Sequence, residues 1–251
     1  MNIVVCCKVV ADDQDILVAG DGALDFSKAH RIVSEYDLNA IEAAVQLAAR
    51  HEGSKVTVAS VADAKADDSK LKKGVLARGV DELVMVADDA CADLDAHATA
   101  AMLAKLVDPM GADLVVCGDG SADNYAQQVD VQLADALGLP VVTAACSVSV
   151  DGGVATCDRM LETQIQTVQV DLPAVVSVVP DAALPRIPGM KDILAAGKKP
   201  STVDAASDVP TSVVDVAETK APEQAERKLE VLDASVDGDI EKFAAALKAA
   251  L

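Results

Sequence analysis

Aromatic side chains are nearly absent from this chain of 251 residues. Phe26, Tyr36, Tyr125 and Phe243 are the complete set, and there is no tryptophan. A core without rings has to pack aliphatic side chains closely, which favours strands covered by Ala-rich helices. The shortage also argues against nucleic-acid-binding modules that stack bases on aromatic rings.

Basic residues are also scarce, since 21 Lys and Arg stand against 41 Asp and Glu and leave a formal net charge of -20. Such a charge repels nucleic acids and anionic membrane surfaces, so we expect no nucleic-acid partner. No apolar run approaches the length of a transmembrane helix, so we expect no membrane insertion. The chain starts directly with a strand-like run instead of a signal-peptide pattern, which predicts a cytoplasmic protein.

Catalytic and metal-binding patterns are missing as well. The six cysteines include no C-x-x-C pair, and they are typical of small buried residues in a reducing compartment. His30, His51 and His97 are scattered, and there is no H-E-x-x-H motif or nucleophile elbow. We therefore predict no metal site and no catalytic residues, which favours a binding or carrier protein over an enzyme.

A regular alternation of strand-like and helix-like segments is present up to residue 140. The expected strands are residues 3–10, 55–61, 82–86 and 113–117, and the expected helices are residues 35–50, 66–77, 93–107 and 126–137. This order predicts an α/β fold with a Rossmann-like, doubly wound and mostly parallel sheet.

Four further strand-like runs follow, at residues 141–150, 154–157, 164–170 and 174–179. The sequence Asp151-Gly152-Gly153 separates the first two and is typical of a tight hairpin turn. These runs predict that antiparallel strands extend the edge of the sheet.

Residues 181–251 do not have the pattern of a second domain. Proline recurs among Asp, Ser, Thr and Ala, and only residues 240–250 have the pattern of a helix. A segment of this composition buries little of its own surface. A disordered tail is one interpretation. We favour an arm that wraps a partner and docks its terminal helix there, next to an α/β domain formed by residues 1–180.

The most informative stretch, residues 118–128, reads GDGSADNYAQQ and lies between an apolar strand and a helix. Glycines let the backbone approach a phosphate, and free N–H groups at a helix start hold the anion. Open α/β sheets bind their ligands at this edge. The stretch is neither a P-loop nor a G-x-G-x-x-G motif, so an ordinary Gly-rich loop is the alternative. We expect Asp119 and Asp123 to point away from a phosphate or to accept backbone N–H groups.

A second unusual stretch places Met190 between Pro188, Gly189 and Lys191. A methionine in such a loop suits an exposed, adaptable anchor for another protein. The alternative is a linker whose methionine contacts its own core.

Taken together, these stretches resemble the β subunit of the electron transfer flavoproteins, in particular its FixA-like branch tied to anaerobic metabolism. The resemblance extends over nearly the whole chain and is carried by NIVVCCKVV, SEYDLNAIEAAVQL, CGDGSADNYAQQ, LPAVV and IPGMKDILAAGKKP. It implies an adenine-nucleotide-binding fold of the adenine nucleotide α-hydrolase-like type.

The resemblance also implies cofactors. The β subunit of this family binds AMP, or a second FAD in electron-bifurcating members, and an α subunit supplies most of the main FAD site. The implied nucleotide contacts are Cys6, Ser34, Glu35, Tyr36, Asp37, Val61, Gly118, Asp119, Gly120, Ser121, Ala122, Asp123, Asn124, Tyr125, Ala126, Gln127, Gln128 and Val129. Tyr125 departs from the small hydroxyl residue usual in the family, so a phosphate contact by this side chain does not follow. The choice between AMP and FAD, and bifurcation itself, stay open.

The same resemblance implies a heterodimer with the α subunit that shuttles electrons between flavin dehydrogenases and a redox partner. It places the docking loop for an acyl-CoA dehydrogenase-like or quinone-reductase-like partner on Ile187, Pro188, Gly189, Met190, Lys191 and Asp192. Met190 would be the apolar anchor. A stand-alone nucleotide-binding signalling module of the same fold is the alternative, because the Gly-rich loop alone would serve either function.

Overall fold

The computed structural model describes residues 1–223 and 229–250. The chain forms two compact units. The first comprises Met1–Leu17 and Asp25–Glu218, and the second comprises Val18–Leu24 and Thr219–Leu251. The first unit contains the large sheet and both sites discussed below.

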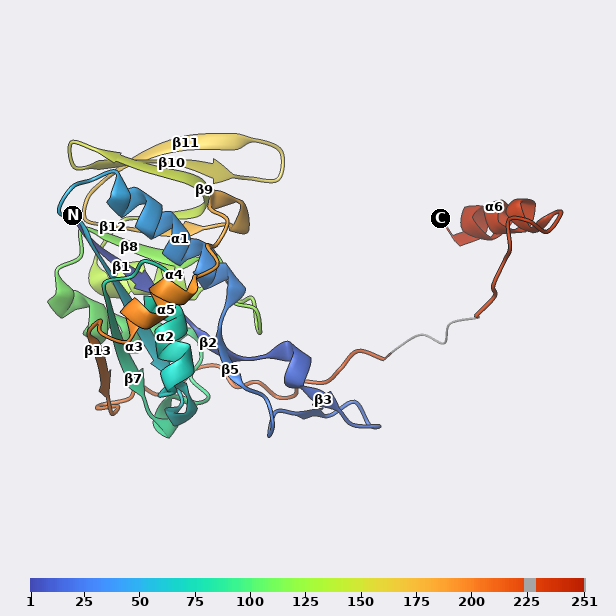
Figure 1. The fold of residues 1–251 in the computed structure, drawn as a ribbon, viewed down its shortest axis with the longest axis horizontal. Helices are drawn as coiled ribbons and strands as arrows, with labels where there is room; N and C mark the ends of the chain where they lie inside the picture. Colours follow the sequence, from blue (N-terminus) through green and yellow to red (C-terminus); the bar gives the residue numbers. More distant parts are fainter. Residues whose placement is uncertain (224–228, 251) are drawn as a thin grey trace. The chain divides into compact units, whose positions relative to one another are not determined.

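A nine-stranded sheet forms the centre of the first unit, in the order β11-β10-β9-β12-β8-β1-β6-β7-β13 (Figure 1). Its strands are β1 (Asn2–Cys6), β6 (Lys55–Ala62), β7 (Glu82–Ala87), β8 (Leu114–Gly118), β9 (Val141–Asp151), β10 (Val154–Met160), β11 (Ile165–Asp171), β12 (Ala174–Val178) and β13 (Ser201–Asp204). In the spatial order from β9 to β13, every pair of neighbouring strands is parallel. At the other edge, β10 is antiparallel to both β9 and β11. The predicted α/β fold is confirmed, although β12 lies within the parallel part of the sheet.

Helices cover both faces of this sheet. One face packs against α1 (Glu35–Ala49), α2 (Ser69–Leu76) and α5 (Met190–Ala196), which lie on the near side in Figure 1. The other face packs against α3 (Ala96–Val107) and α4 (Val129–Leu137). Along β1, Ile3 and Val5 belong to the first cluster and Val4 to the second, and all three are 0% exposed. A parallel strand buried on both faces needs such a continuous apolar run.

Two boundaries differ from the sequence-based expectation. The run at residues 3–10 is divided, because β1 ends at Cys6 and a new strand, β2 (Val9–Ala11), pairs with β5 (Arg31–Val33). Two further short strands, β3 (Leu17–Val18) and β4 (Leu24–Asp25), form a separate pair. The helix expected from residue 126 begins only at Val129, because Tyr125 and Gln127 have φ of 44° and 54°. A right-handed helix excludes positive φ.

The compact first unit continues beyond the boundary at residue 180 that the sequence suggests. Strand β13 pairs in parallel with β7 at the sheet edge, and α5 packs on α2. Asp95 accepts the backbone N–H groups of Val213 and Val214 at 2.7 and 2.9 Å. Residues 181–218 therefore obtain part of their order from this chain. Backbone pairing at a sheet edge requires no hydrophobic pattern, so composition alone does not reveal it.

The second unit contains α6 (Asp239–Ala250), which confirms the helix expected at residues 240–250. Gly22 accepts the N–H of Ala221 at 2.9 Å, which joins the two segments of this unit. On α6, Ile240, Phe243 and Leu247 are 60%, 58% and 49% exposed. Their spacing puts these three side chains on one face of the helix.

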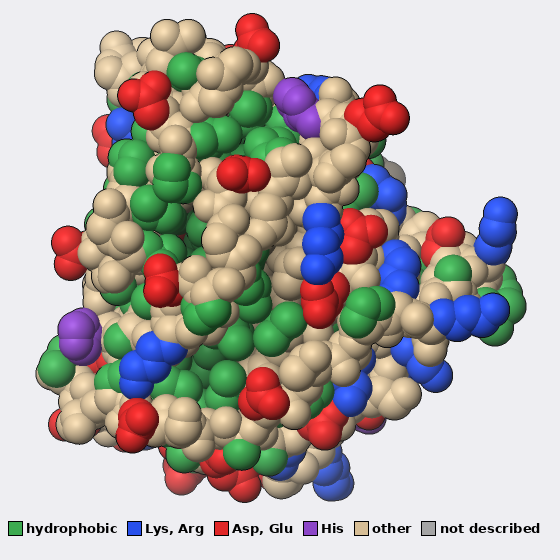
Figure 2. All heavy atoms as spheres, turned by 90° about the vertical axis from the view of Figure 1, so that its left-hand side faces the viewer, with side chains coloured by type: hydrophobic (Ala, Val, Ile, Leu, Met, Phe, Trp, Pro, Cys, Tyr) green, Lys and Arg blue, Asp and Glu red, His purple; other side chains and the backbone are tan. Residues whose placement is uncertain are grey.

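The large acidic excess is dispersed on the face seen in Figure 2, where Asp and Glu side chains lie singly among a broad area of hydrophobic ones. No helix among the described residues combines the length and the apolar character that crossing a bilayer requires.

Candidate functional site

The candidate site lies where parallel strands end at the same edge of the sheet. Cys6, the last residue of β1, pairs with Ala59 of β6 on one side and Cys117 of β8 on the other. Gly118 then ends β8 and starts the Gly-rich loop. The edge formed by the carboxyl ends of parallel strands is the usual ligand-binding edge of an open α/β sheet.

Asp37, in the first turn of α1, joins two of these strand ends. Its Oδ2 accepts the backbone N–H of Lys8 at 2.7 Å, and its Oδ1 accepts the N–H of Gly118 at 3.2 Å. The side chain is buried. Burial raises the pKa of Asp37 to about 7, although the N–H groups of Lys8 and Gly118 favour its charged form. One carboxyl group thus holds the backbone after β1 and after β8 at the same time.

Close approach of α1 explains the glycine at position 118. A Cβ there would lie 2.7 Å from Oδ1 of Asp37 and 3.0 Å from the carbonyl carbon of Tyr36. At Gly120, a Cβ would overlap the ring of Tyr125. A side chain at position 118 would therefore push against the start of α1, whereas one at position 120 would displace the Tyr125 ring.

Ser34 precedes α1 and supports the loop instead of capping the helix. Its side chain makes no capping hydrogen bond to the helix, and its Oγ accepts the backbone N–H of Ala122 at 3.2 Å. Ser34 is 0% exposed, so this contact lies beneath the exposed residues 122–128.

The two tyrosines of the chain meet above the loop. The ring centroids of Tyr36 and Tyr125 are 5.0 Å apart, with the planes inclined by 42°. The hydroxyl of Tyr125 donates to Oδ2 of Asp119 at 3.0 Å. Burial raises the pKa of Asp119, against the lowering effect of the Tyr125 and Gln127 donors. Asp119 is therefore turned beneath the Tyr125 ring.

Asp123 is held by a different set of donors. The ammonium of Lys8 lies 2.6 Å from Oδ2, and the backbone N–H of Asn124 lies 2.7 Å from Oδ1. The hydroxyl of Ser121 donates to Oδ1 as well. Burial acts to raise the pKa of Asp123, but the Lys8 and Ser121 hydrogen bonds outweigh it and lower the pKa. As expected, this carboxylate accepts a backbone N–H group.

The donors of the loop suit an anionic group. Within residues 118–128, all of which are described, six backbone N–H groups have no acceptor, those of Gly120, Ser121, Asp123, Ala126, Gln127 and Gln128. The Lys8 ammonium is paired with Asp123, whereas Oδ1 of the buried Asp119 has no hydrogen-bond partner among the described residues. Backbone N–H groups without acceptors can bind an anionic group such as a phosphate.

The structure divides the sequence-predicted contacts into two groups. It brings Ser34, Tyr36 and Asp37 together with the loop from residue 118 to residue 127. By contrast, the side chain of Cys6 is buried in a hydrophobic cluster, and those of Val61 and Val129 pack against the same cluster. Glu35 is exposed on the first turn of α1.

Sequence reasoning did not include Lys8 among the site residues. The available signal was its position directly after the first strand, at the ligand-binding edge. Among the described residues no group of His, Cys, Asp and Glu could hold a metal ion.

The predicted docking loop, residues 187–192, lies at the start of α5. Met190 is 74% exposed and Ile187 is 94% exposed, so the alternative of a methionine contacting its own core is wrong. Asp192 accepts the N–H of Gly189 at 3.0 Å and closes the turn before the helix.

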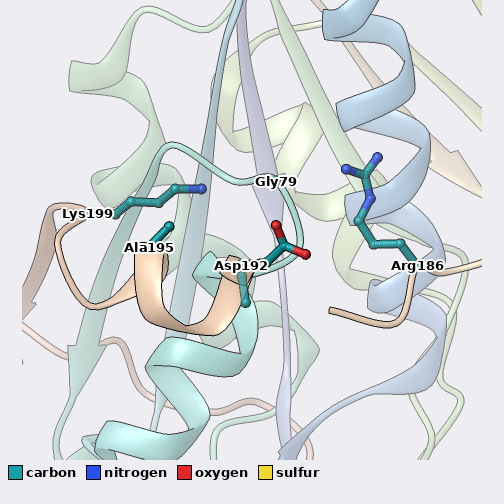
Figure 3. Close-up of a pocket in the computed structure, with 6 residues that line it drawn as sticks. Gly79, Arg186, Asp192, Ala195 and Lys199 are labelled. Atoms are coloured by element: carbon teal, nitrogen blue, oxygen red, sulfur yellow. The ribbon is translucent and has the colours of Figure 1, made fainter. Parts of the chain in front are cut away.

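Two cavities of the first unit lie away from the Gly-rich loop. One of about 120 Å³ is next to α5 and is lined by Ala77, Gly79, Arg186, Asp192, Ala195 and Lys199 (Figure 3). The other, of about 560 Å³, includes Met1, His51 and Pro173. The Tyr125 ring against Gly120 fills space next to the loop.

The family model described as "Electron transfer flavoprotein domain" matches residues 22–209. The matched range includes the start of α1, the Gly-rich loop and the exposed loop around Met190.

Proposed function

The chain belongs to the electron transfer flavoprotein family, and from this we propose that it is the β subunit of a heterodimeric electron carrier of the FixA-like branch. The observation that carries the proposal is the Gly-rich loop, whose free N–H groups are held in place by Asp37 and Ser34. Members of this family bind flavin and carry electrons. The flavin supplies the redox chemistry, while the protein supplies binding, orientation and electrostatics.

The proposed ligand of the Gly-rich loop is AMP or a second FAD. Its phosphate would accept hydrogen bonds from the N–H groups of Gly120, Ser121 and Gln127, and the Lys8 ammonium would balance its charge. The remaining proposed contacts, from Cys6, Val61 and Val129, would come from the backbone. The main FAD would be shared with the α subunit.

The proposed α subunit would also order the C-terminal arm. The exposed face of α6 formed by Ile240, Phe243 and Leu247 supports this, since an apolar helix face is what a protein partner can cover. The arm within residues 181–251 would then have two parts: residues up to 218 packed on their own sheet, and the rest on the partner.

The proposed redox partner, an acyl-CoA dehydrogenase-like or quinone-reductase-like protein, would dock on residues 187–192. The exposure of Met190 and Ile187 supports this role. The six cysteines are free thiols, which supports a reducing compartment such as the cytoplasm.

The central experiment is to purify the chain together with its α subunit and to record the visible spectrum. Nucleotides released by denaturation would then be separated and counted. We expect flavin absorbance and either one flavin with one AMP per heterodimer, or two flavins, which would indicate bifurcation. Absence of both flavin and adenine nucleotide would reject the proposal.

A stand-alone nucleotide-binding module is the second candidate, because the loop and its supports all come from this chain. It predicts a homo-oligomer whose melting temperature rises with ATP. Size-exclusion chromatography decides between the two: a chain that becomes stable only with a second polypeptide excludes the module.

A further inference from the structure

Two cationic side chains hold the exposed docking loop and α5, namely Arg186 before this segment and Lys199 after it. Between them, Ile187, Met190 and Leu194 are 94%, 74% and 70% exposed. Burial of these large apolar side chains therefore does not order the segment. Only Ala196, at 1% exposed, enters the core.

The first anchor is Arg186, which forms a two-pronged pair with Glu42 of α1. Its Nε lies 2.6 Å from Oε2 and its Nη2 lies 3.0 Å from Oε1. The Glu42 side chain is 8% exposed, and Gln46 donates a further hydrogen bond to it at 2.9 Å. Burial of Glu42 acts to raise its pKa, but the Arg186 hydrogen bonds outweigh it and lower the pKa. Paired, charge-assisted hydrogen bonds of this geometry are strong.

Neighbouring groups reinforce this first anchor. Arg78 donates to the carbonyl of Arg186 at 2.6 Å, so the backbone as well as the side chain is held. A Cβ at Gly79 would lie 2.9 Å from Nη1 of Arg186, so this glycine makes room for the guanidinium. Upstream, Asn39 of α1 donates to the carbonyls of Pro180 and Ala183 at 2.9 and 2.8 Å.

The second anchor is Lys199. Its ammonium donates to the carbonyl of Leu76 at 2.9 Å and to that of Val80 at 2.5 Å. The first of these carbonyls ends α2, where the helix leaves acceptors without partners and favours a cation. In Figure 3, Arg186 and Lys199 lie to either side of Gly79, with Asp192 and Ala195 of α5 between them.

We infer that two contacts hold the docking loop in a preformed shape. Glu42 binds Arg186 before the loop, and the carbonyl groups of Leu76 and Val80 bind Lys199 after α5. Glu42 is thereby a positioning residue for partner docking. A loop ordered in advance loses less conformational entropy on binding, so the partner binds more tightly. The inference rests on the proposed docking role of Met190, and the experiment below separates the two.

The first measurement is amide hydrogen exchange of the heterodimer carrying Glu42→Gln. The N–H groups of Ile193 and Lys198 donate within the segment, to Gly189 and Ala195, and report on its order. We expect exchange in residues 190–198 to become at least about tenfold faster, as loss of the charged pair lets the segment open. Residues of β1 should keep their exchange rates.

Glu82→Gln is the matched control, because Glu82 also pairs with a cation, Lys55 at 2.5 Å, but on β7. It should leave exchange in residues 190–198 unchanged. Lys199→Met tests the other anchor and should also accelerate exchange, which keeps the inference testable if Glu42→Gln does not fold. Unchanged exchange in both anchor variants overturns the inference.

The second measurement is electron transfer from an acyl-CoA dehydrogenase. Glu42→Gln should raise KM for the carrier severalfold and leave kcat unchanged, because the flavin is untouched. If Met190→Ala raises KM and Glu42→Gln does not, the positioning role is wrong and the docking role stands. If Met190→Ala leaves KM unchanged, the proposed docking role itself fails.

Discussion

At the scale of single residues, buried polar side chains hold the site together: Asp37 and Ser34 accept backbone N–H groups of other segments, and Asp119 accepts the hydroxyl of Tyr125. Asp37, Ser34 and Asp119 are 5%, 0% and 7% exposed, and each holds part of the Gly-rich loop or a strand end next to it. The stability of the fold should depend on the protonation of such a group, and loss of one hydrogen-bond partner should lower it, because water cannot replace the lost hydrogen bond at a buried atom.

Asp37 should make stability depend on pH. The unfolded chain releases this proton near the ordinary Asp pKa of about 3.9, whereas the folded chain holds it up to about pH 7. Between these values the folded state binds more protons, so the free energy of unfolding falls as the pH rises, by at most ~1.4 kcal/mol per pH unit. Urea denaturation of the wild-type chain and of Asp37→Asn across this pH range measures this fall in the free energy of unfolding. The assignment is contradicted if the unfolding free energy of the wild-type chain, minus that of Asp37→Asn, stays constant or grows as the pH rises.

Tyr125→Phe tests the hydrogen bond beneath the ring pair. The change keeps the ring and removes the donor to Asp119, so we expect a loss of about 1 kcal/mol of unfolding free energy. The remaining tyrosine, Tyr36, provides the fluorescence signal for the urea titration, since the chain has no tryptophan. Tyr36→Phe is the control, because its hydroxyl makes no hydrogen bond among the described residues, and it should change stability little. Equal losses in both variants would argue against a role for the Asp119 contact.

At the scale of elements, α1 organises both sites. Its first turn carries Asp37 toward the Gly-rich loop, and one turn later Glu42 reaches the anchor of the docking loop. Asn39 lies between them and holds the segment that leads from β12 to that loop. A single helix therefore couples the positions of the Gly-rich loop and of the exposed loop around Met190 to the same sheet.

Gly118→Ala should disturb the junction between β8 and α1. The added methyl group would lie within 2.7 Å of Oδ1 of Asp37. We expect a loss of about 1–3 kcal/mol in stability and a lower AMP or FAD content of the purified heterodimer. Gly74→Ala is the control: it lies in α2, nothing is within 4 Å of its added Cβ, and it should stabilise by about 0.5–1 kcal/mol. Full nucleotide content in Gly118→Ala would show that the close approach does not matter for binding.

At the scale of the whole molecule, the division into two units predicts separate roles. The first unit contains the sheet, its helices and both sites, so a chain ending at Glu218 should lose only the helical circular dichroism of α6 and melt within a few degrees of the full chain. The same truncation removes the exposed face of α6, and we expect it to abolish formation of the heterodimer in size-exclusion chromatography. A truncated chain that still assembles with the α subunit as tightly as the full chain would contradict the proposed role of the arm.

The sequence by itself determined the class of fold and the place of the Gly-rich loop after β8. Alternating apolar segments and turn residues specify local structure, so the parallel sheet, α1 and the terminal helix followed from periodicity, and the hairpin at Gly152 from its turn residues. The Gly-rich stretch after β8 marked the carboxyl end of a strand for the same reason.

Only the tertiary structure decided which distant groups meet. Asp37 with Gly118, Glu42 with Arg186, and β13 with β7 are contacts between segments far apart in the chain. Periodicity carries no information about such pairs, because they depend on how the crossovers arrange the strands and on which polar groups burial leaves in need of a partner.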